Sequence, residues 1–235
     1  MRPYLPPVAS STLCLLVQGQ DGLILVDTGL GTRDCTAPSL KMRIFRALMR
    51  SPRGLSHTAH QQIVELGLRP ADVNHILVTH LHLDHSGGLP DFPDAVVHTT
   101  RPEYEAATTP IGVRRLYYEQ AHWRHGPRWR LHGDVQPRAW FGFDAIEVRE
   151  IGSPRVLLVP LPGHSPGHAG VAVETDEGWL FHCGDALPFG GLESPAPDGI
   201  SSLGCGPHIA RIRRFAEEHP DQVEVVSSHA PLQRE

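Results

Sequence analysis

The junction between an apolar stretch, residues 75–79, and the histidine-rich segment behind it constrains the fold more than any other feature of the sequence. The segment reads Thr-His-Leu-His-Leu-Asp-His and is followed by Ser-Gly-Gly. Just past the end of a strand, side chains at i and i+2 point to the same side, so His80 and His82 can converge on one ion. Asp84 and His85 then fall beside a neighbouring position, where the two glycines allow a sharp turn.

The donor count of this segment suggests more than one ion. A catalytic zinc ion takes about four nitrogen, oxygen or sulfur ligands and leaves one position to water. Four donors within six residues therefore suit two neighbouring ions. The alternative, a polar loop whose histidines happen to cluster, is favoured for a single pair of histidines but not for this run behind a buried strand.

Three later segments place further donors at the ends of predicted strands. Residues 156–160 lead into Pro-Gly-His164-Ser-Pro-Gly-His, residues 179–183 into Gly-Asp185-Ala, and residues 223–227 into Ser-His229-Ala-Pro. Strand ends gather along one edge of a sheet, so we expect His164, Asp185 and His229 to meet the first histidine segment there.

The motifs, taken in this order, resemble those of the metallo-β-lactamase superfamily, and the upstream Leu-Ile-Leu-Val-Asp27-Thr-Gly matches as well. The resemblance covers nearly the whole chain. It implies an α/β fold, a four-layer αββα sandwich (the metallo-β-lactamase fold), with the metals at one edge of two packed sheets. It also implies the ligands, residue by residue: His80, His82 and His164 for a first metal, Asp84, His85 and His229 for a second, and Asp185 as the bridge between them.

A complete ligand set implies two metal ions per chain, with zinc expected and iron or manganese as alternatives. The bridging carboxylate favours lactonases and glyoxalase II-like thioesterases over true β-lactamases, which lack it. Two cations would lower the pKa of the water between them towards about 7, and the bridging hydroxide would attack a carbonyl. Asp84 is the catalytic candidate that orients this nucleophile and passes its proton to the leaving group.

The first choice of reaction is hydrolysis of a lactone or ester, with acyl-homoserine lactones as candidate substrates. A glyoxalase II-like thioesterase is the alternative. A further alternative is a mono-iron site formed by His80, His164 and Asp185, as in persulfide dioxygenases of the superfamily. Asp27 is a candidate for supporting the ligands and can equally close a turn, whereas for His168 a structural role is favoured over support of the ligands. His182 and Cys183 are expected to pack in the core.

Two insertions at the metal edge are expected to select the substrate, residues 108–136 and 187–205. The first mixes aromatic and basic residues and is predicted to be a helix followed by an irregular cap; a surface helix without contact to substrate is the alternative. Related lactonases carry a tyrosine three residues after the bridging aspartate, where this chain has Pro188. Tyr117 or Tyr118 could replace it.

Helices are predicted for residues 39–49, where Leu40, Ile44 and Leu48 recur at helical spacing, and for residues 57–66, with Ser56 as N-cap and Gly67 as the stop. A further helix starts after Thr100, and another spans 207–219.

The composition is that of an ordinary globular protein. Its 235 residues suit one domain, residues 1–235, and the formal net charge of −5 gives no indication of a nucleic-acid or membrane partner. The expected partner is a small-molecule substrate, and a homodimer stays open. No secretion signal is recognisable in residues 1–17, so a cytoplasmic location and free thiols at the four cysteines are expected.

Overall fold

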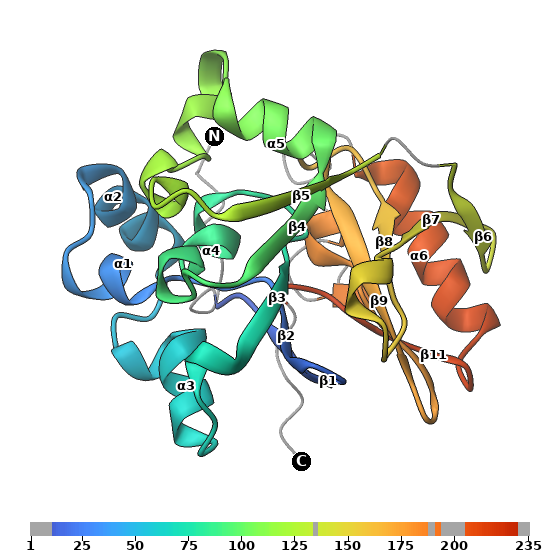
Figure 1. Ribbon diagram of the computed structural model, residues 1–235. Helices are drawn as coiled ribbons and strands as arrows, with labels where there is room; N and C mark the ends of the chain where they lie inside the picture. The colour runs from blue at the N-terminus through green and yellow to red at the C-terminus, as the bar shows by residue number, and fades with distance from the viewer. Residues whose placement is uncertain (1–10, 134–135, 188–190, 194–204, 230–235) are drawn as a thin grey trace.

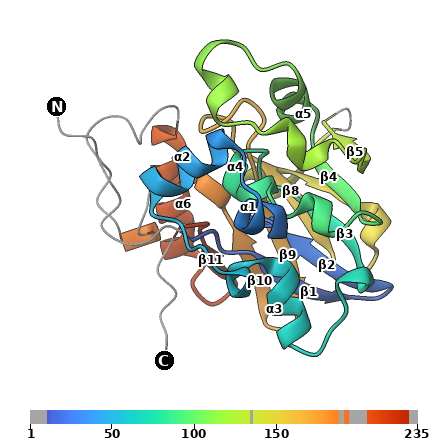
Figure 2. The same cartoon turned by 90° about the vertical axis from the view of Figure 1, so that its left-hand side faces the viewer.

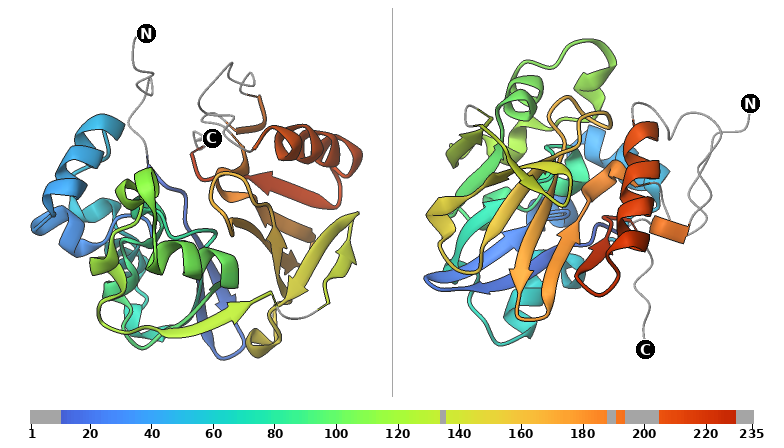
Figure 3. Two further views of the ribbon diagram at one scale, coloured as in Figure 1. Left: turned by 90° about the horizontal axis from the view of Figure 1, so that it is seen from above. Right: turned by 90° about the vertical axis from the view of Figure 1, so that its right-hand side faces the viewer.

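A computed structural model describes residues 11–133, 136–187, 191–193 and 205–229. Two sheets lie face to face with helices on their outer sides (Figure 1; Figure 3, left). This arrangement confirms the predicted αββα sandwich. Within the described residues, no helix combines the length and the apolar character needed to cross a membrane.

The first sheet has five strands in the order of the chain. Its first two strands form an antiparallel hairpin, and the following strands run parallel to one another. The strands are β1 Leu15–Gly19, β2 Gly22–Val26, β3 Val73–Leu77, β4 Val96–Thr100 and β5 Arg128–His132.

The second sheet has six strands in reverse chain order, and only its last strand runs parallel to its neighbour. The strands are β6 Arg138–Trp140, β7 Phe143–Glu147, β8 Val156–Pro160, β9 Ala169–Thr175, β10 Gly178–His182 and β11 Val223–Val226. Three strands predicted in this half of the chain, residues 156–160, 179–183 and 223–227, lie within one residue of β8, β10 and β11.

Helices cover the two outer faces (Figure 2). The described α-helices are α1 Thr32–Thr36, α2 Leu40–Met49, α3 Ala59–Glu65, α4 Leu83–Ser86, α5 Arg101–Thr108 and α6 Gly206–Glu218. Only α6 covers the second sheet, where Phe215 and Ile212 pack on Phe143 and Phe181. Between the sheets, Ile24 and Leu77 of the first pack with residues of the second such as Leu158. The two sheets therefore share an apolar core, and the single domain of residues 1–235 stays a prediction.

Three predictions about helices need correction. The N-cap of α3 is Thr58, whose side chain accepts a hydrogen bond from the Gln61 N–H, and not Ser56, which lies in a short 3₁₀ turn. Gly67, with a φ of 76°, does follow this helix as predicted.

The apolar stripe that predicted α2 is not the buried face of this helix. Leu40, Ile44 and Leu48 are 71%, 53% and 56% exposed, whereas Met42 and Arg46 are buried. The Arg46 guanidinium donates to the backbone oxygens of Asp34 and Pro52, so the inward face of the helix is partly polar.

The segment 108–136 contains no α-helix in its described part beyond the last residue of α5. It forms two 3₁₀ turns, Gly112–Leu116 and Gln120–Trp123, and then β5. Strand β5 pairs with β4 along Val96 to Thr100, so the end of the predicted cap is an edge strand of the first sheet. Helix periodicity could not reveal this, because the aromatic and basic residues of β5 alternate at its exposed edge.

Three histidines form a hydrogen-bonded row across β3, β4 and β5. His75 Nδ1 lies 3.0 Å from His98 Nε2, and His98 Nδ1 lies 3.0 Å from His132 Nε2. Burial lowers the pKa of His98 to about 3, and the nearby His132 and His75 add to this shift. His98 therefore stays neutral in the fold at pH values where an unfolded histidine is protonated.

This row makes the metal-free chain sensitive to acid. An unfolded histidine takes up a proton near pH 6.5, whereas His98 in the fold stays neutral. The unfolded state is therefore stabilised as the pH falls, and the free energy of unfolding drops by about 2 kcal/mol for His98 between pH 6.5 and 5. We expect His98→Gln to reduce the loss of unfolding free energy over this range by about that amount. Urea titrations in chelator at pH 7 and pH 5 measure it, with the exposed His57→Gln as control. An unchanged pH dependence in His98→Gln would contradict the assignment.

Candidate metal centre

Four strand ends deliver the ligand-type side chains to one place. The loop after β3 carries His80, His82, Asp84 and His85, with α4 starting at Leu83. The loops after β8, β10 and β11 supply one side chain each from the opposite sheet: His164, Asp185 and His229. All seven residues singled out in the sequence therefore lie at the same edge of the sandwich.

The nitrogen and oxygen atoms of these residues form three overlapping groups, and within each group they lie within 4.8 Å of one another. The groups are His80, His82 and His164; His80, His85 and Asp185; and Asp84, His85 and His229.

Asp185 lies at the centre of the cluster. Its Oδ1 is 3.4 Å from His85 Nε2, and its Oδ2 is 3.3 Å from His164 Nε2 and 3.4 Å from His229 Nε2. Asp84 is more peripheral, with its Oδ2 3.5 Å from His229 Nε2. One carboxylate thus faces histidines of both the first and the last group.

The burial of this cluster tests whether it fits metal ions. His80 Nε2, His85 Nε2 and Asp185 Oδ1 are buried and make no hydrogen bond among the described residues, although His85 Nε2 and Asp185 Oδ1 lie 3.4 Å apart as an ion pair. Leaving one such atom unsatisfied costs about 1–3 kcal/mol, so native folds rarely keep several together. Inward-facing imidazole nitrogens beside a carboxylate are the donors that zinc and related cations take. The residues fit a metal centre.

Asp27 and Thr79 set which nitrogen of two histidines faces inward. The Thr79 hydroxyl lies 2.8 Å from Asp27 Oδ2, to which it donates, and 3.1 Å from His80 Nδ1. A hydroxyl has one proton, so His80 Nδ1 must carry the hydrogen of the second contact, which leaves Nε2 with its lone pair. His85 Nδ1 donates to the same carboxylate at 2.8 Å, so its Nε2 also faces inward. Asp27 therefore supports the ligands, one of the two roles considered for it, whereas Thr79 was not expected to contribute.

His168 holds Asp185 in place from behind. The backbone N–H of Asp185 donates to His168 Nε2 at 3.0 Å, and His168 Nδ1 donates to the Leu161 oxygen at 3.2 Å. Burial lowers the pKa of His168 to about 3, so the ring stays neutral and can accept. Gly184 makes this contact possible, since its φ is 58° and a Cβ there would come within 2.5 Å of His168 Nε2.

His182 and Cys183 are buried as expected, and His182 bridges the Leu13 oxygen and the Gly184 N–H.

The charges of the two outer groups differ when no cation is bound. Burial lowers the pKa of His80 and His82 well below the usual range, and the neighbouring histidines lower it further. Burial also lowers the pKa of His85, but nearby carboxylates, Asp185 first, outweigh burial and hold it well above the usual range. Burial raises the pKa of Asp185, yet the surrounding histidines, His229 first, keep it well below. Without a cation, His80 and His82 are therefore held in their neutral form, whereas the carboxylates around His85 favour its charged form.

Segment 108–136 lines the first group. The Leu83 N–H donates to the Tyr117 oxygen at 3.0 Å, and the rings of Tyr117 and Tyr118 lie 5.2 and 5.1 Å from the His82 ring. Tyr117 is 46% exposed and Tyr118 is 2% exposed. The Tyr118 hydroxyl donates to Glu103 at 3.2 Å, so of the two tyrosines only Tyr117 is available to a bound molecule.

Two sets of supporting residues were missed in the sequence. Ser86, His122 and Asp34 form a buried chain, with 3.2 Å from Ser86 Oγ to His122 Nδ1 and 3.1 Å from His122 Nε2 to Asp34 Oδ1. Ser86 also donates to the His82 oxygen at 2.9 Å, which anchors the metal loop. Glu103 is fully buried among the same loops. A pattern search finds none of these, because isolated polar residues carry no spacing signal.

Most of segment 187–205, including Pro188, lies outside the described residues, as do Ala230 and Pro231 of the last motif. The expected role of this second insertion, and the position where lactonases carry a tyrosine, are therefore not described.

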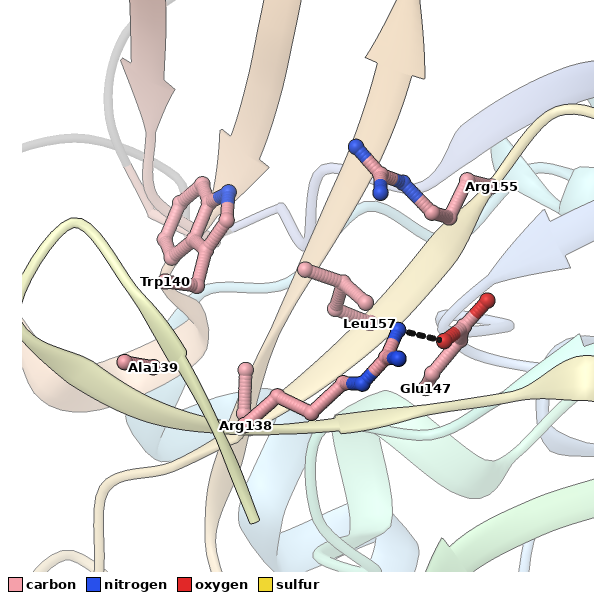
Figure 4. A pocket seen from close by; sticks show the side chains of 7 residues that line it. Arg138, Ala139, Trp140, Glu147, Arg155 and Leu157 are labelled. Atoms are coloured by element: carbon pink, nitrogen blue, oxygen red, sulfur yellow. Dashed lines mark hydrogen bonds and ion pairs between the residues drawn. The ribbon is translucent and has the colours of Figure 1, made fainter.

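A hollow of about 280 Å³ on the second sheet lies apart from this centre (Figure 4). It is lined by residues such as Trp140 and Leu157, and its charged side chains are paired: Arg138 with Glu147 at 2.8 Å and Arg155 with Glu174 at 2.8 Å. It shares no residue with the three groups.

Comparison with known proteins shows the family of the chain. The profile of the metallo-beta-lactamase superfamily matches residues 8–226. A probable metallo-hydrolase of Mycobacterium tuberculosis is 44% identical over 175 residues, which are 74% of this chain and 56% of that protein. The chain thus spans little more than half of this relative. An N-acyl homoserine lactonase of Bacillus cereus is 29% identical over 196 residues, 77% of this chain and 70% of the relative.

Solved structures show the same fold. An N-acyl homoserine lactone hydrolase, with the product N-hexanoyl-L-homoserine at its catalytic metal centre, matches with a TM-score of 0.64 and 23% identity, over 92% of this chain and 80% of that one. AidC, a dizinc quorum-quenching lactonase, matches with a TM-score of 0.62 and 18% identity, over 94% and 73% of the two chains.

Proposed function

Because the chain belongs to the metallo-β-lactamase superfamily, we propose that it is a metal-dependent hydrolase that opens a lactone or cleaves an ester at the strand-end cluster. The observation that carries this proposal is the set of buried atoms around Asp185 that could bind a metal and make no hydrogen bond among the described residues, namely His80 Nε2, His85 Nε2 and Asp185 Oδ1. Relatives named as N-acyl homoserine lactonases support a lactone as the first substrate to test.

The proposed site holds two ions, with zinc as the first candidate. His80, His82 and His164 would hold one, Asp84, His85 and His229 the other, and Asp185 would be shared, since its two oxygens face histidines of both groups. Bound there, divalent cations supply Lewis acidity, which polarises a carbonyl and lowers the pKa of water towards about 7.

The protein's own groups orient the reactants and move the proton. The His164 side chain is 31% exposed, against 6% for His229, so the carbonyl group would approach from the side of His164. The Asp84 side chain is 14% exposed and lies beside the last group, where it can pass a proton to the leaving oxygen. Asp27 and His168 keep their partners fixed, which reduces the reorganisation needed during reaction.

A substrate panel tests the proposed reaction. Zinc-loaded protein is expected to open acyl-homoserine lactones faster than it cleaves thioesters, phosphodiesters or β-lactams, and a chelator should abolish the activity. Asp185→Asn, which removes the shared charge, should lose metal and turnover together. Preference for a thioester would favour the glyoxalase II-like alternative. One iron per chain with sulfur oxidation would favour the dioxygenase alternative and contradict hydrolysis.

We also propose that Tyr117 forms part of the substrate wall. Its ring lies beside His82 and is 46% exposed, so it can contact a substrate without ligating metal. The two 3₁₀ turns of segment 108–136 would then act as a cap that selects among acyl groups.

Truncation of this wall should change selectivity and spare the metal. Tyr117→Ala should lower kcat/KM by roughly 10- to 100-fold, which corresponds to losing about 1–3 kcal/mol of contact, and should alter the preference among acyl chain lengths. Phe141→Ala is the control, because Phe141 packs on Trp140 and Phe215 at the outer face of the second sheet. It should lower stability only. Flat selectivity in Tyr117→Ala would remove the segment from the active site.

A further inference from the structure

We infer that Glu103 is a positioning residue that holds the first group of ligands together, by joining the loop of His80 and His82 to the loop of His164. This inference rests on the ligand assignment proposed above. It concerns the binding of metal and not the chemical step, because the Glu103 side chain has no contact with the ligand atoms of the described cluster.

Glu103 has a position in the chain that normally serves another purpose. Thr100 is the N-cap of α5, and its side chain accepts a hydrogen bond from the Glu103 N–H. A glutamate three residues after a threonine cap usually turns its carboxylate back to the backbone N–H of the cap residue. Here both carboxylate oxygens accept hydrogen bonds from other segments instead.

Each oxygen of Glu103 contacts a different part of the site. Oε1 accepts from the Leu81 N–H at 2.9 Å and from the Tyr118 hydroxyl at 3.2 Å. Oε2 accepts from the Ser165 hydroxyl at 2.6 Å and from the Gly167 N–H at 3.1 Å. Leu81 lies between His80 and His82, and Ser165 follows His164, so one carboxylate fastens both loops.

The hydrogen-bonding pattern requires a carboxylate. Glu103 is 0% exposed, and its carboxylate contacts two backbone N–H groups and two hydroxyls, all of which can donate hydrogen bonds. An ionised carboxylate only accepts, so it satisfies these donors together, and charge-assisted hydrogen bonds of this kind are stronger than neutral ones. A glutamine of the same shape would turn an N–H₂ group towards two of the donors.

The two loops also pack tightly against the start of α5. The Thr100 hydroxyl donates to the Gly167 oxygen at 2.6 Å. A Cβ added at Gly167 would overlap the Glu103 backbone nitrogen, so only glycine fits this approach. The start of α5 therefore contacts the His164 loop twice. Thr100 donates to the Gly167 oxygen, and Glu103 accepts from the Gly167 N–H.

The last group of ligands is fastened by a different carboxylate. Asp27 accepts from His85 Nδ1 and from the Thr79 N–H, each at 2.8 Å, and neither contact involves Glu103. Thr79, which bonds to Asp27, also contacts His80, and Ser86 also anchors the loop of His82, but of the two carboxylates only Glu103 contacts the loop of His164. The two positioning carboxylates should therefore affect the two metal sites unequally.

Metal titration of the full chain tests this inference. Metal-free protein is titrated with zinc against a chromophoric chelator, and wild type should show two sites. Glu103→Gln should weaken one site by 10- to 100-fold, in the range seen when a group supporting metal ligands is removed, and leave the other within about threefold. X-ray absorption of this variant with one zinc bound should show the ligation of Asp84, His85 and His229, with carboxylate oxygen in the shell. Asp27→Asn should weaken the other site more strongly.

Two further variants separate positioning from general stability. Glu147→Gln is the control, because the Glu147 side chain is 24% exposed and pairs with Arg138 at 2.8 Å on the second sheet, away from the ligand loops. It should lower the melting temperature and leave both affinities unchanged. Ser165→Ala keeps Glu103 and removes one donor, so it should weaken the same site as Glu103→Gln by a few-fold, even if the glutamine variant does not fold.

The outcomes distinguish this inference from the proposed function. If wild type binds two zinc ions and Glu103→Gln binds both with unchanged affinity, only the role of Glu103 is overturned. The same holds if Glu103→Gln and Ser165→Ala weaken both sites equally, since that result indicates a general loss of stability. If wild type binds no zinc at this cluster, the proposed function fails and this inference fails with it.

Discussion

The need to satisfy buried polar atoms governs the edge of this sandwich. His80 Nε2, His85 Nε2 and Asp185 Oδ1 point into one buried space where the described residues offer no hydrogen-bond partner. Such an arrangement is costly in a low-dielectric interior unless a charged group enters it. A cation removes this cost directly, because the imidazole lone pairs and the carboxylate become its ligands. The free energy of cation binding can therefore offset the cost of burying these atoms without hydrogen bonds.

The surrounding hydrogen bonds keep these atoms from finding other partners. Asp27 accepts a hydrogen bond from His85 Nδ1, and the Thr79 hydroxyl accepts one from His80 Nδ1. The Nε2 atoms of both rings are therefore directed inward. His168 accepts a hydrogen bond from the backbone N–H of Asp185. Glu103 accepts hydrogen bonds from both loops that carry the first group. Apart from Thr79, which precedes His80 in the chain, each support comes from an element other than the loop that it holds. The site is thus fixed by the assembly of both sheets with α5 and not by any single motif.

The ligands could be predicted from the sequence, but most of their supports could not. His80, His82, Asp84 and His85 are close in sequence, and the later ligands each follow a recognisable strand, so chain order alone indicates where they meet. Glu103 is different, because Thr-x-x-Glu before a helix predicts a local cap and nothing in its spacing points to a loop more than sixty residues away. The outward stripe of α2 was misleading for a related reason: periodicity predicts a helix, while the packing partners decide which face is buried. Segment 108–136 has no dominant hydrophobic period. Its residues 128–132 form β5 by pairing with β4, which is a distant segment of the chain.

Anomalous diffraction at the zinc edge, from crystals of the full chain grown with zinc, tests the central claim most directly. The account predicts two peaks on either side of Asp185, one among His80, His82 and His164 and the other among Asp84, His85 and His229, each at about 2 Å from its ligand atoms. A single peak, or peaks away from Asp185, would contradict a centre in which this carboxylate is shared between two ions.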